Sequence, residues 1–271
     1  MSFSSDVLSV RIAHHVATLT LDNPVRRNAM GPPFWDDLPK AIATIDGTPD
    51  IRAVVLCANG PHFTVGLDLK SMGAARVEGE SQAQQRLRMY EDIKRLQASI
   101  TAVGACRVPV IAAIHGYCIG GGIDLIAACD VRLASSDATF SVRETKVAIT
   151  ADVGTLQRLP NVLNAGHVAE LVYTGKDINA NRAREIGLVN EVYEDREATV
   201  DAALSMATEI AANSPLAVQG SKAVLRAGDD LTVEQGLEYV ALWNAAFLPS
   251  DDLTEAMTAF LEKRAPRFHG R

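Results

Sequence analysis

The chain opens with two short segments in which apolar and polar residues alternate. Residues 7–12 and 16–21 follow this period of two and are rich in β-branched side chains, as half-buried strands are. The short linker Ala13-His14-His15 joins them, and Asp22-Asn23-Pro24 ends the second segment. The pattern predicts a β-hairpin at the start of the fold.

Helical and strand patterns alternate over the next hundred residues. Leu38, Ile42 and Ile45 have helical spacing within residues 34–46, and Pro39 predicts that this helix starts near it or bends there. Residues 53–58 and 108–114 are apolar runs typical of buried strands, and residues 82–104 form a long helical pattern between them.

Helices dominate the last part of the sequence. Short strands are predicted at residues 131–134, 139–142 and 188–192, and helices at residues 153–163, 165–173, 180–186, 197–213, 215–226, 231–247 and 251–263. The order predicts an α/β core over residues 1–195, followed over residues 196–271 by a helical region that packs an oligomer.

Composition and charge exclude several classes of protein. Of the 271 residues, 48% are hydrophobic, and the net charge of -7 argues against nucleic acid as a partner, since binding phosphates needs a basic face. The four cysteines lie in apolar stretches without metal-binding spacing, so no metal site is expected. With neither a long apolar run nor a recognisable signal peptide, we predict a soluble, cytoplasmic protein that does not contact membranes.

The most informative segment is a run of three glycines, Gly120-Gly121-Gly122, which is followed by Asp124. Three consecutive glycines are costly in backbone entropy, so they indicate that side chains would obstruct something there. If a helix opens at Gly122, its free N–H groups point back at the glycines and favour an anion or a developing oxyanion. A tight strand-to-helix turn without a ligand explains the run equally well.

A second glycine turn is predicted within residues 63–70, at Gly66. We expect a strand-to-helix turn here as well, and two such turns side by side can direct two backbone N–H groups at one oxygen. Taken alone, Gly66 is explained by the turn itself.

Three acidic residues are candidates for proton transfer. Asp124 in the first turn of a helix, Glu144 between Arg143 and Lys146, and Asp152 before a helix each have an ordinary structural explanation, as a helix-dipole partner, a surface ion pair and an N-cap. Asp152, however, lies among apolar neighbours, and poor solvation there would raise its pKa, as suits a proton donor.

Several of these segments resemble the crotonase, or enoyl-CoA hydratase/isomerase, superfamily. Residues 63–70 resemble its FxxGxDLK signature, residues 108–132 its longest motif, and the similarity continues through residues 140–160 to residues 259–264. The resemblance implies a crotonase-like ββα spiral core. It also implies a homo-oligomer, as trimers or hexamers, and a coenzyme A thioester substrate with no further cofactor.

Within the superfamily, the acids and the string ADVGTLQRLP at residues 151–160 resemble the Δ3,5-Δ2,4-dienoyl-CoA isomerases. The resemblance implies that Glu144 removes the C2 proton of a 3,5-dienoyl-CoA and that Asp152 delivers a proton to C6, giving the 2,4-dienoyl-CoA of fatty-acid β-oxidation. Asp124 assists in a role that the resemblance leaves open.

The same resemblance implies the remaining site residues. The backbone N–H groups of Leu67 and Gly121 form the oxyanion hole. Contacts to the substrate and its coenzyme A are implied for Arg26, Phe63, Thr64, Val65, Gly66, Asp68 and Lys70, and, from a neighbouring subunit, for Phe260 and Lys263.

Three alternatives remain open from the sequence. An enoyl-CoA hydratase would add water to a 2-trans-enoyl-CoA at the same site, and a non-catalytic acyl-CoA-binding protein would use only the pocket. A dinucleotide-binding domain would place Glu144 on a ribose, although the spacing G-x-G-x-x-G is absent.

Overall fold

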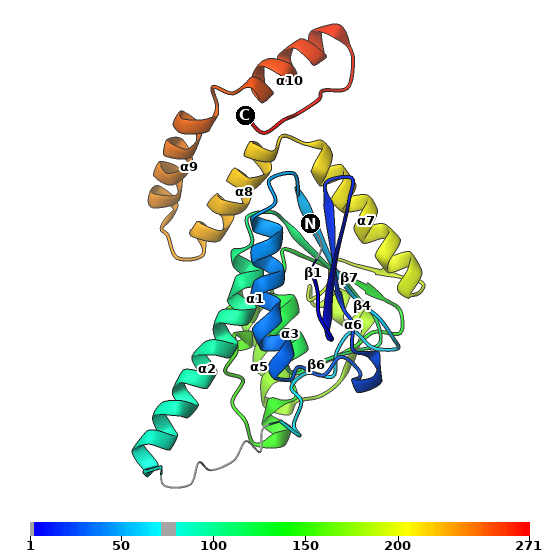
Figure 1. Cartoon of the computed structure of the whole chain (residues 1–271), viewed down its shortest axis with the longest axis vertical. Coiled ribbons are helices and arrows are strands. Elements are labelled where there is room, and N and C mark those ends of the chain that lie inside the picture. Colours follow the sequence, from blue (N-terminus) through cyan, green and yellow to red (C-terminus); the bar gives the residue numbers. More distant parts are fainter. Residues whose placement is uncertain (1–2, 72–79) are drawn as a thin grey trace.

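The computed structural model describes residues 3–71 and 80–271 and has an α/β core from which helices extend (Figure 1). The main sheet has the strand order β1-β2-β3-β4-β5-β7-β10, antiparallel at β1–β3 and parallel from β3 onward. Its strands are β1 (Phe3–Ser4), β2 (Leu8–Ala13), β3 (Val16–Leu21), β4 (Ala53–Ala58), β5 (Val110–Ile114), β7 (Val131–Ser135) and β10 (Glu191–Tyr193). The predicted α/β class is confirmed.

The N-terminal hairpin is confirmed as predicted. β2 and β3 pair in register from Leu8 with Leu21 to Ala13 with Val16, so His14 and His15 form a two-residue loop. Both histidines have positive φ, of 48° and 66°, as the tight turn that matches strand twist requires. The alternating apolar positions therefore face one side of the sheet.

Each face of the sheet has its own hydrophobic core. On one face the short side chains of α7 (Arg196–Ala212), among them Ala203 and Ala207, pack on Val55, Ile111 and their neighbours. On the other face Val54, Leu56 and Ala112 belong to the larger core, with α1 (Pro32–Asp46) and α3 (Gly121–Ala127). The parallel strands are thus apolar on both sides, which explains their continuous apolar sequences.

A second, three-stranded sheet was not predicted in full. It has the order β6-β8-β9, with β6 (Tyr117–Ile119), β8 (Thr139–Ser141) and β9 (Ile178–Asn179). The predicted strand at residues 139–142 contains β8, whereas β6 and β9 were missed. β6 follows β5 after only two residues and leads straight into the glycines, and β9 has only two residues, so neither stands out as a separate alternating or apolar run. β6 leads directly into Gly120 and α3, so this small sheet carries the glycine run.

Helix α2 (Gln82–Ala105) begins at a capping box formed by Ser81 and Gln84. Its C-terminal half packs on α1, where Arg95 pairs with Asp36 at 2.7 Å. Ile100 and Val103, both in this half of α2, are buried. This half of α2 is therefore firmly attached to the core.

Four predictions about elements were wrong in detail. Helix α1 begins at Pro32 and continues through Pro39, so it does not start near that second proline. The prolines at its first positions suit a helix start, whereas Pro39 leaves one interior hydrogen bond of the helix unmade, and burial of the apolar face holds the helix together there. Residues 63–70 form irregular backbone with isolated bridges, and no helical residue occurs in this segment up to residue 71, where the described part ends. The predicted helix at 153–163 is broken into α4 (Thr155–Arg158) and η3 (Leu159–Asn161) at Pro160. The last strand is β10, at 191–193.

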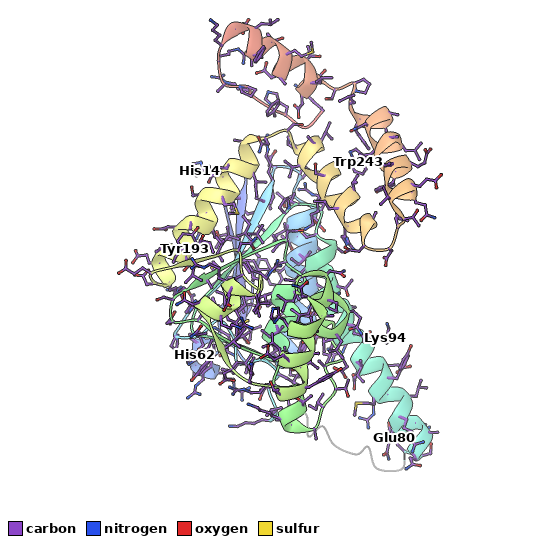
Figure 2. The ribbon with its side chains drawn as sticks, turned by 180° about the vertical axis from the view of Figure 1, so that it is seen from behind. His14, His62, Glu80, Lys94, Tyr193 and Trp243 are labelled. Atoms are coloured by element: carbon purple, nitrogen blue, oxygen red, sulfur yellow. The ribbon has the colours of Figure 1, made fainter. Side chains whose placement is uncertain are left out.

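The remaining helices are η1 (Pro24–Arg26), η2 (Glu144–Val147), α5 (Ala165–Thr174), α6 (Ala180–Glu185), α8 (Pro215–Gly228), α9 (Val233–Phe247) and α10 (Asp251–Glu262). Helix α8 is tied to the core by buried Lys222, whose Nζ donates to Asp130 at 2.6 Å and to the carbonyl of Val108 at 2.9 Å. Trp243 on α9 lies against Gly220 of α8, and α9 and α10 project beyond α8 (Figures 1 and 2).

Candidate active site

Two glycine-containing segments meet beside β6. Thr64 forms a parallel bridge with Cys118, which aligns residues 63–67 with the small sheet. Gly66 has φ of 79°, and a Cβ there would lie 2.4 Å from the carbonyl oxygen of Ile119 and 3.2 Å from the nitrogen of Gly121. Both the conformation and the space therefore require glycine at position 66.

This packing brings two backbone N–H groups together. A Cβ on Gly121 would lie only 3.8 Å from the nitrogen of Leu67. Met30 fixes the segment on either side, since its N–H donates to Gly66 and its carbonyl accepts from Asp68. Within the described part of the chain, neither Leu67 N–H nor Gly121 N–H has a hydrogen-bond acceptor. Two free donors so placed can receive one carbonyl oxygen.

A pocket of about 120 Å³ opens at these donors. Among the described residues, its walls combine apolar side chains with three carboxyl groups and one arginine. The lining residues are Trp35, Val65, Leu67, Leu69, Ile119, Gly120, Gly121, Asp124, Arg143, Glu144, Val147, Ile149, Asp152 and Val153. The structure therefore brings all three acids predicted from the sequence into one small pocket with both predicted donors.

Glu144 begins η2 and lies over the glycine turn. Its Oε1 would be 3.5 Å from a Cβ on Gly120, and its Oε2 is buried without a hydrogen-bond partner among the described residues. Burial raises the pKa of this carboxyl to about 7, and the nearby charges of Asp124 and Asp152 add to the effect. The group can therefore exchange a proton near neutral pH.

Asp124 is buried in the first turn of α3, as its position in the sequence predicts. Its Oδ1 accepts a hydrogen bond from the backbone N–H of Thr155 at 2.5 Å, so it also caps the start of α4. Burial raises the pKa of Asp124, the hydrogen bonds with Thr155 oppose this, and nearby Asp152 adds to the rise. The structural role of Asp124 is thus to hold the loop that carries Asp152.

Asp152 lies in the irregular segment between η2 and α4 and is partly buried. Burial raises the pKa of its carboxyl, as its apolar neighbours predict. Its backbone carbonyl accepts a hydrogen bond from Gln97 Nε2 of α2 at 2.7 Å. The side chain reaches the pocket while the backbone is held from behind.

Not all of the residues predicted to contact the substrate and its coenzyme A line the pocket. Val65 lines the pocket, whereas Phe63 and Thr64 are fully buried in the core and do not line it. Arg26 and Asp68 pair with each other at 3.0 Å, and Lys70 is exposed close by in the sequence. These three charged residues lie outside the pocket lining, and we refer to them as the charged edge.

Phe260 and Lys263 lie far along the chain, at the end of α10. Phe260 is 82% exposed, and α10 projects away from α3 and β6 (Figure 1). The structure does not bring these two residues to the pocket of their own chain.

Several pocket residues were missed from the sequence. Trp35, Val147 and Ile149 supply apolar walls, and Arg143 lines the pocket while its guanidinium pairs with Asp177 at 2.5 Å. The position of Trp35 in a helical pattern indicates only a core residue, so no signal in a single sequence separates it from other buried aromatics.

Membrane-spanning and metal-binding features are both absent from residues 3–71 and 80–271. No helix there is long and apolar enough to cross a membrane. No group of three or more His, Cys, Asp or Glu side chains there is arranged to hold a metal ion.

Comparison with known proteins gives a consistent result. The profile of the family described as "Enoyl-CoA hydratase/isomerase" matches residues 11–271. The chain is 44% identical to the peroxisomal Delta(3,5)-Delta(2,4)-dienoyl-CoA isomerase of Arabidopsis thaliana, covering 92% of this chain and 91% of the relative. It is 46% identical to the mitochondrial Delta(3,5)-Delta(2,4)-dienoyl-CoA isomerase of Dictyostelium discoideum, covering 93% and 87%.

The fold has close counterparts among solved structures. The crystal structure of an enoyl-CoA hydratase from Bacillus anthracis matches with a TM-score of 0.89 and 31% identity, over 98% of this chain and 100% of that chain. The expected crotonase-like core with a C-terminal helical region is thereby confirmed.

Proposed function

Since the chain belongs to the enoyl-CoA hydratase/isomerase family, we propose that it is a Δ3,5-Δ2,4-dienoyl-CoA isomerase acting in fatty-acid β-oxidation. The observation that supports this most directly is the placement of three carboxyl groups around one pocket with two free backbone donors. The names of the two relatives reported above support the same reaction.

The reaction begins at the thioester carbonyl. Its oxygen accepts hydrogen bonds from the N–H groups of Leu67 and Gly121, and this stabilises the negative charge that develops when the C2 proton leaves. Glu144, ionised, takes that proton. Because a carboxylate in an apolar pocket is a stronger base than one in water, its raised pKa suits this step.

The second step returns a proton at the other end of the conjugated system. In this scheme Asp152 holds a proton at the start of the cycle and delivers it to C6 of the dienolate, and the double bonds shift to positions 2 and 4. Burial raises the pKa of the Asp152 carboxyl, which is the direction that a proton donor requires. The net change moves one proton from C2 to C6, and Glu144 and Asp152 exchange protonation states. No cofactor is needed beyond the coenzyme A of the substrate.

Asp124 acts in this scheme through its neighbours. Its hydrogen bond to Thr155 holds the start of α4, three residues from Asp152, and its charge raises the pKa of Glu144. We propose that it supports both acids without itself transferring a proton to carbon.

The coenzyme A portion and the oligomer complete the proposal. Arg26 and Lys70 at the charged edge contact the nucleotide end, while Phe260 and Lys263 reach it from a neighbouring subunit of a trimer or hexamer. The exposed apolar side chains of Met257, Phe260 and Leu261 on α10 support such packing. Light scattering of the purified chain measures the assembly, and a monomer would contradict this part.

The location in the cell is a separate question. The two relatives reported above are named as peroxisomal and mitochondrial, which differs from the cytoplasmic location predicted from the sequence. The cytoplasmic location therefore stays a prediction. Imaging of a tagged chain in its own cells distinguishes these locations.

One assay separates the main alternatives. The protein is incubated with a 3,5-dienoyl-CoA, and the absorbance of a conjugated 2,4-diene is followed. In parallel, hydration of a 2-trans-enoyl-CoA is measured. We expect the diene to grow and hydration to be slow, whereas rapid hydration without diene formation would establish the hydratase alternative.

Two further measurements address the remaining alternatives. A non-catalytic acyl-CoA-binding protein would turn over neither substrate, and the variants Glu144→Gln and Asp152→Asn would change nothing that can be measured. A dinucleotide-binding domain would be stabilised against heat by NAD, and we expect no such shift.

A further inference from the structure

The segment that carries Asp152 has no regular structure to fix it. Residues 148–153 lie between η2 and α4, and α4 has only one turn. The direction in which the Asp152 carboxyl enters the pocket therefore depends on contacts made by the backbone of this segment.

Gln97 makes a contact with the acid's own peptide. Its Nε2 donates to the carbonyl oxygen of Asp152, at 2.7 Å, across 55 residues of sequence. A carbonyl oxygen can only accept, so the amide must present its NH2 to Asp152. The other end of the amide, Oε1, accepts from Lys94 Nζ at 3.0 Å. Both ends of the amide are thus satisfied in one orientation.

The part of α2 that carries Gln97 is packed on the core. Gln97 lies in the half of α2 that packs on α1, with Ile100 buried just beyond it. Figure 2 shows Lys94 on the same part of the helix, whereas Glu80 marks its far end. One turn after Gln97, Thr101 accepts from Arg158 Nη2 at 2.8 Å, so α2 also holds the end of α4.

We propose that Gln97 is a positioning residue that fixes the peptide of Asp152 and so aims its carboxyl at the far end of the dienolate. The proposal rests on the proposed isomerase function, because only that reaction uses Asp152 as the second acid. Gln97 does not line the pocket and acts on the substrate through Asp152 alone.

The two proton transfers can be measured separately, and this makes the proposal testable. In D2O, removal and return of the C2 proton by Glu144 incorporates deuterium at C2 of recovered 3,5-dienoyl-CoA. Formation of the 2,4-diene additionally requires Asp152. In Gln97→Leu we expect kcat for isomerisation to fall about 10-fold or more, since small misplacements of a reacting group are costly. KM and the C2 exchange rate should stay within about twofold of wild type.

Matched variants control for general damage. Lys94→Met removes the hydrogen bond at the other end of the same amide, and Gln157→Leu makes the same substitution at an exposed position of α4. Both should isomerise within about twofold of wild type. If Gln97→Leu does not fold, Gln97→Glu keeps the shape of the side chain, replaces the donor by an acceptor at neutral to basic pH, and should show the same selective loss.

The measurements distinguish an error in the positioning role of Gln97 from an error in the proposed isomerase function. If wild type forms no 2,4-diene, the function is wrong and the proposal falls with it. If wild type isomerises and Gln97→Leu does so at the same rate, only the positioning role is wrong. An equal loss of C2 exchange and isomerisation in Gln97→Leu would also refute it, because it would indicate disturbance of the whole pocket.

Discussion

The carboxyl of Asp124 accepts a hydrogen bond from the backbone N–H of Thr155, at 2.5 Å, and so connects the helix that follows the glycine run with the helix that follows Asp152. This contact joins two segments 31 residues apart, one of which carries Asp124 into the pocket. An acid that a single sequence assigns to its own helix dipole therefore acts on a second helix.

Removing the charge of Asp124 should change the pH dependence of the reaction. In Asp124→Asn the side-chain oxygen can still accept from Thr155, but the negative charge that raises the pKa of Glu144 is lost. Glu144 must be ionised to act as a base, so the rate rises with pH through its pKa. We expect the acid limb of kcat/KM, near pH 7 in wild type, to move to lower pH. A limb that stays in place or moves upward would contradict this.

The two proposed proton-transfer residues should differ in what their loss abolishes. Glu144→Gln removes the base and should reduce both C2 deuterium exchange and diene formation by about 100-fold or more. Asp152→Asn should reduce diene formation by a similar factor and leave C2 exchange largely intact. Exchange and isomerisation are followed on the same sample in D2O. Loss of C2 exchange in Asp152→Asn, with retention in Glu144→Gln, would reverse the assignment.

Stability should also depend on pH through Glu144. Its pKa is raised from 4.5 to about 7, so the unfolded chain releases this proton at lower pH than the folded protein does. The proton on Glu144 therefore contributes in full to the free energy of unfolding below pH 4.5. This stabilising contribution is lost as the pH rises through about 7. At a pH of about 8, the free energy of unfolding of Glu144→Gln should exceed that of wild type by about 2–3 kcal/mol, so the variant is the more stable protein. This difference should shrink toward a pH of about 5. Denaturant titrations at both values measure it, and equal stabilities at the higher pH would contradict it.

Glycine at position 66 should be essential for both stability and activity. In Gly66→Ala the new Cβ would meet the carbonyl of Ile119 at a positive φ, which costs about 1–3 kcal/mol and displaces the N–H of Leu67. Diene formation should fall at least about 10-fold. A Cβ added to Gly166 in α5 would meet no atom within 4 Å, so Gly166→Ala is the matched control and should be neutral or slightly stabilising.

The attachment of α8 should depend on the Lys222–Asp130 pair. Lys222 is 8% exposed, and Lys222→Met leaves Asp130 without its cation, so we expect a loss of about 1–3 kcal/mol in the free energy of unfolding. Lys40 pairs with Asp37 on the surface with 64% exposure, and Lys40→Met should change stability by less than about 0.5 kcal/mol. Equal effects of the two substitutions would refute a structural role for the buried pair.

The parts of the fold that follow from sequence are those with a repeated period. The hairpin at β2 and β3 and the long helix α2 each span enough residues for alternation or helical spacing to show. β6 has three residues and no period, and the irregular backbone around Gly66 is held by Met30 and Cys118 from elsewhere in the chain. Such contacts between distant segments leave no mark on the local pattern.

The candidate site likewise contains residues that the sequence predicts and residues that it does not. Asp124, Glu144 and Asp152 attract attention because acids beside apolar residues need an explanation, and the structure brings all three together. Gln97 gives no such signal, since a glutamine on a mostly polar helix is ordinary. Its contact with Asp152 exists only because α2 crosses the 148–153 segment in the folded chain.

The two free donors at the pocket are main-chain atoms, and this affects how the site would be seen in genetic data. Only a substitution by proline can remove the N–H of Leu67 or of Gly121. In a saturation mutagenesis scan, this part of the site would therefore appear only as positions, the flanking glycines, at which substitutions are not tolerated. An engineer could vary the three acids to alter the reaction while the carbonyl-binding element, encoded by backbone shape, passes unchanged from one variant to the next.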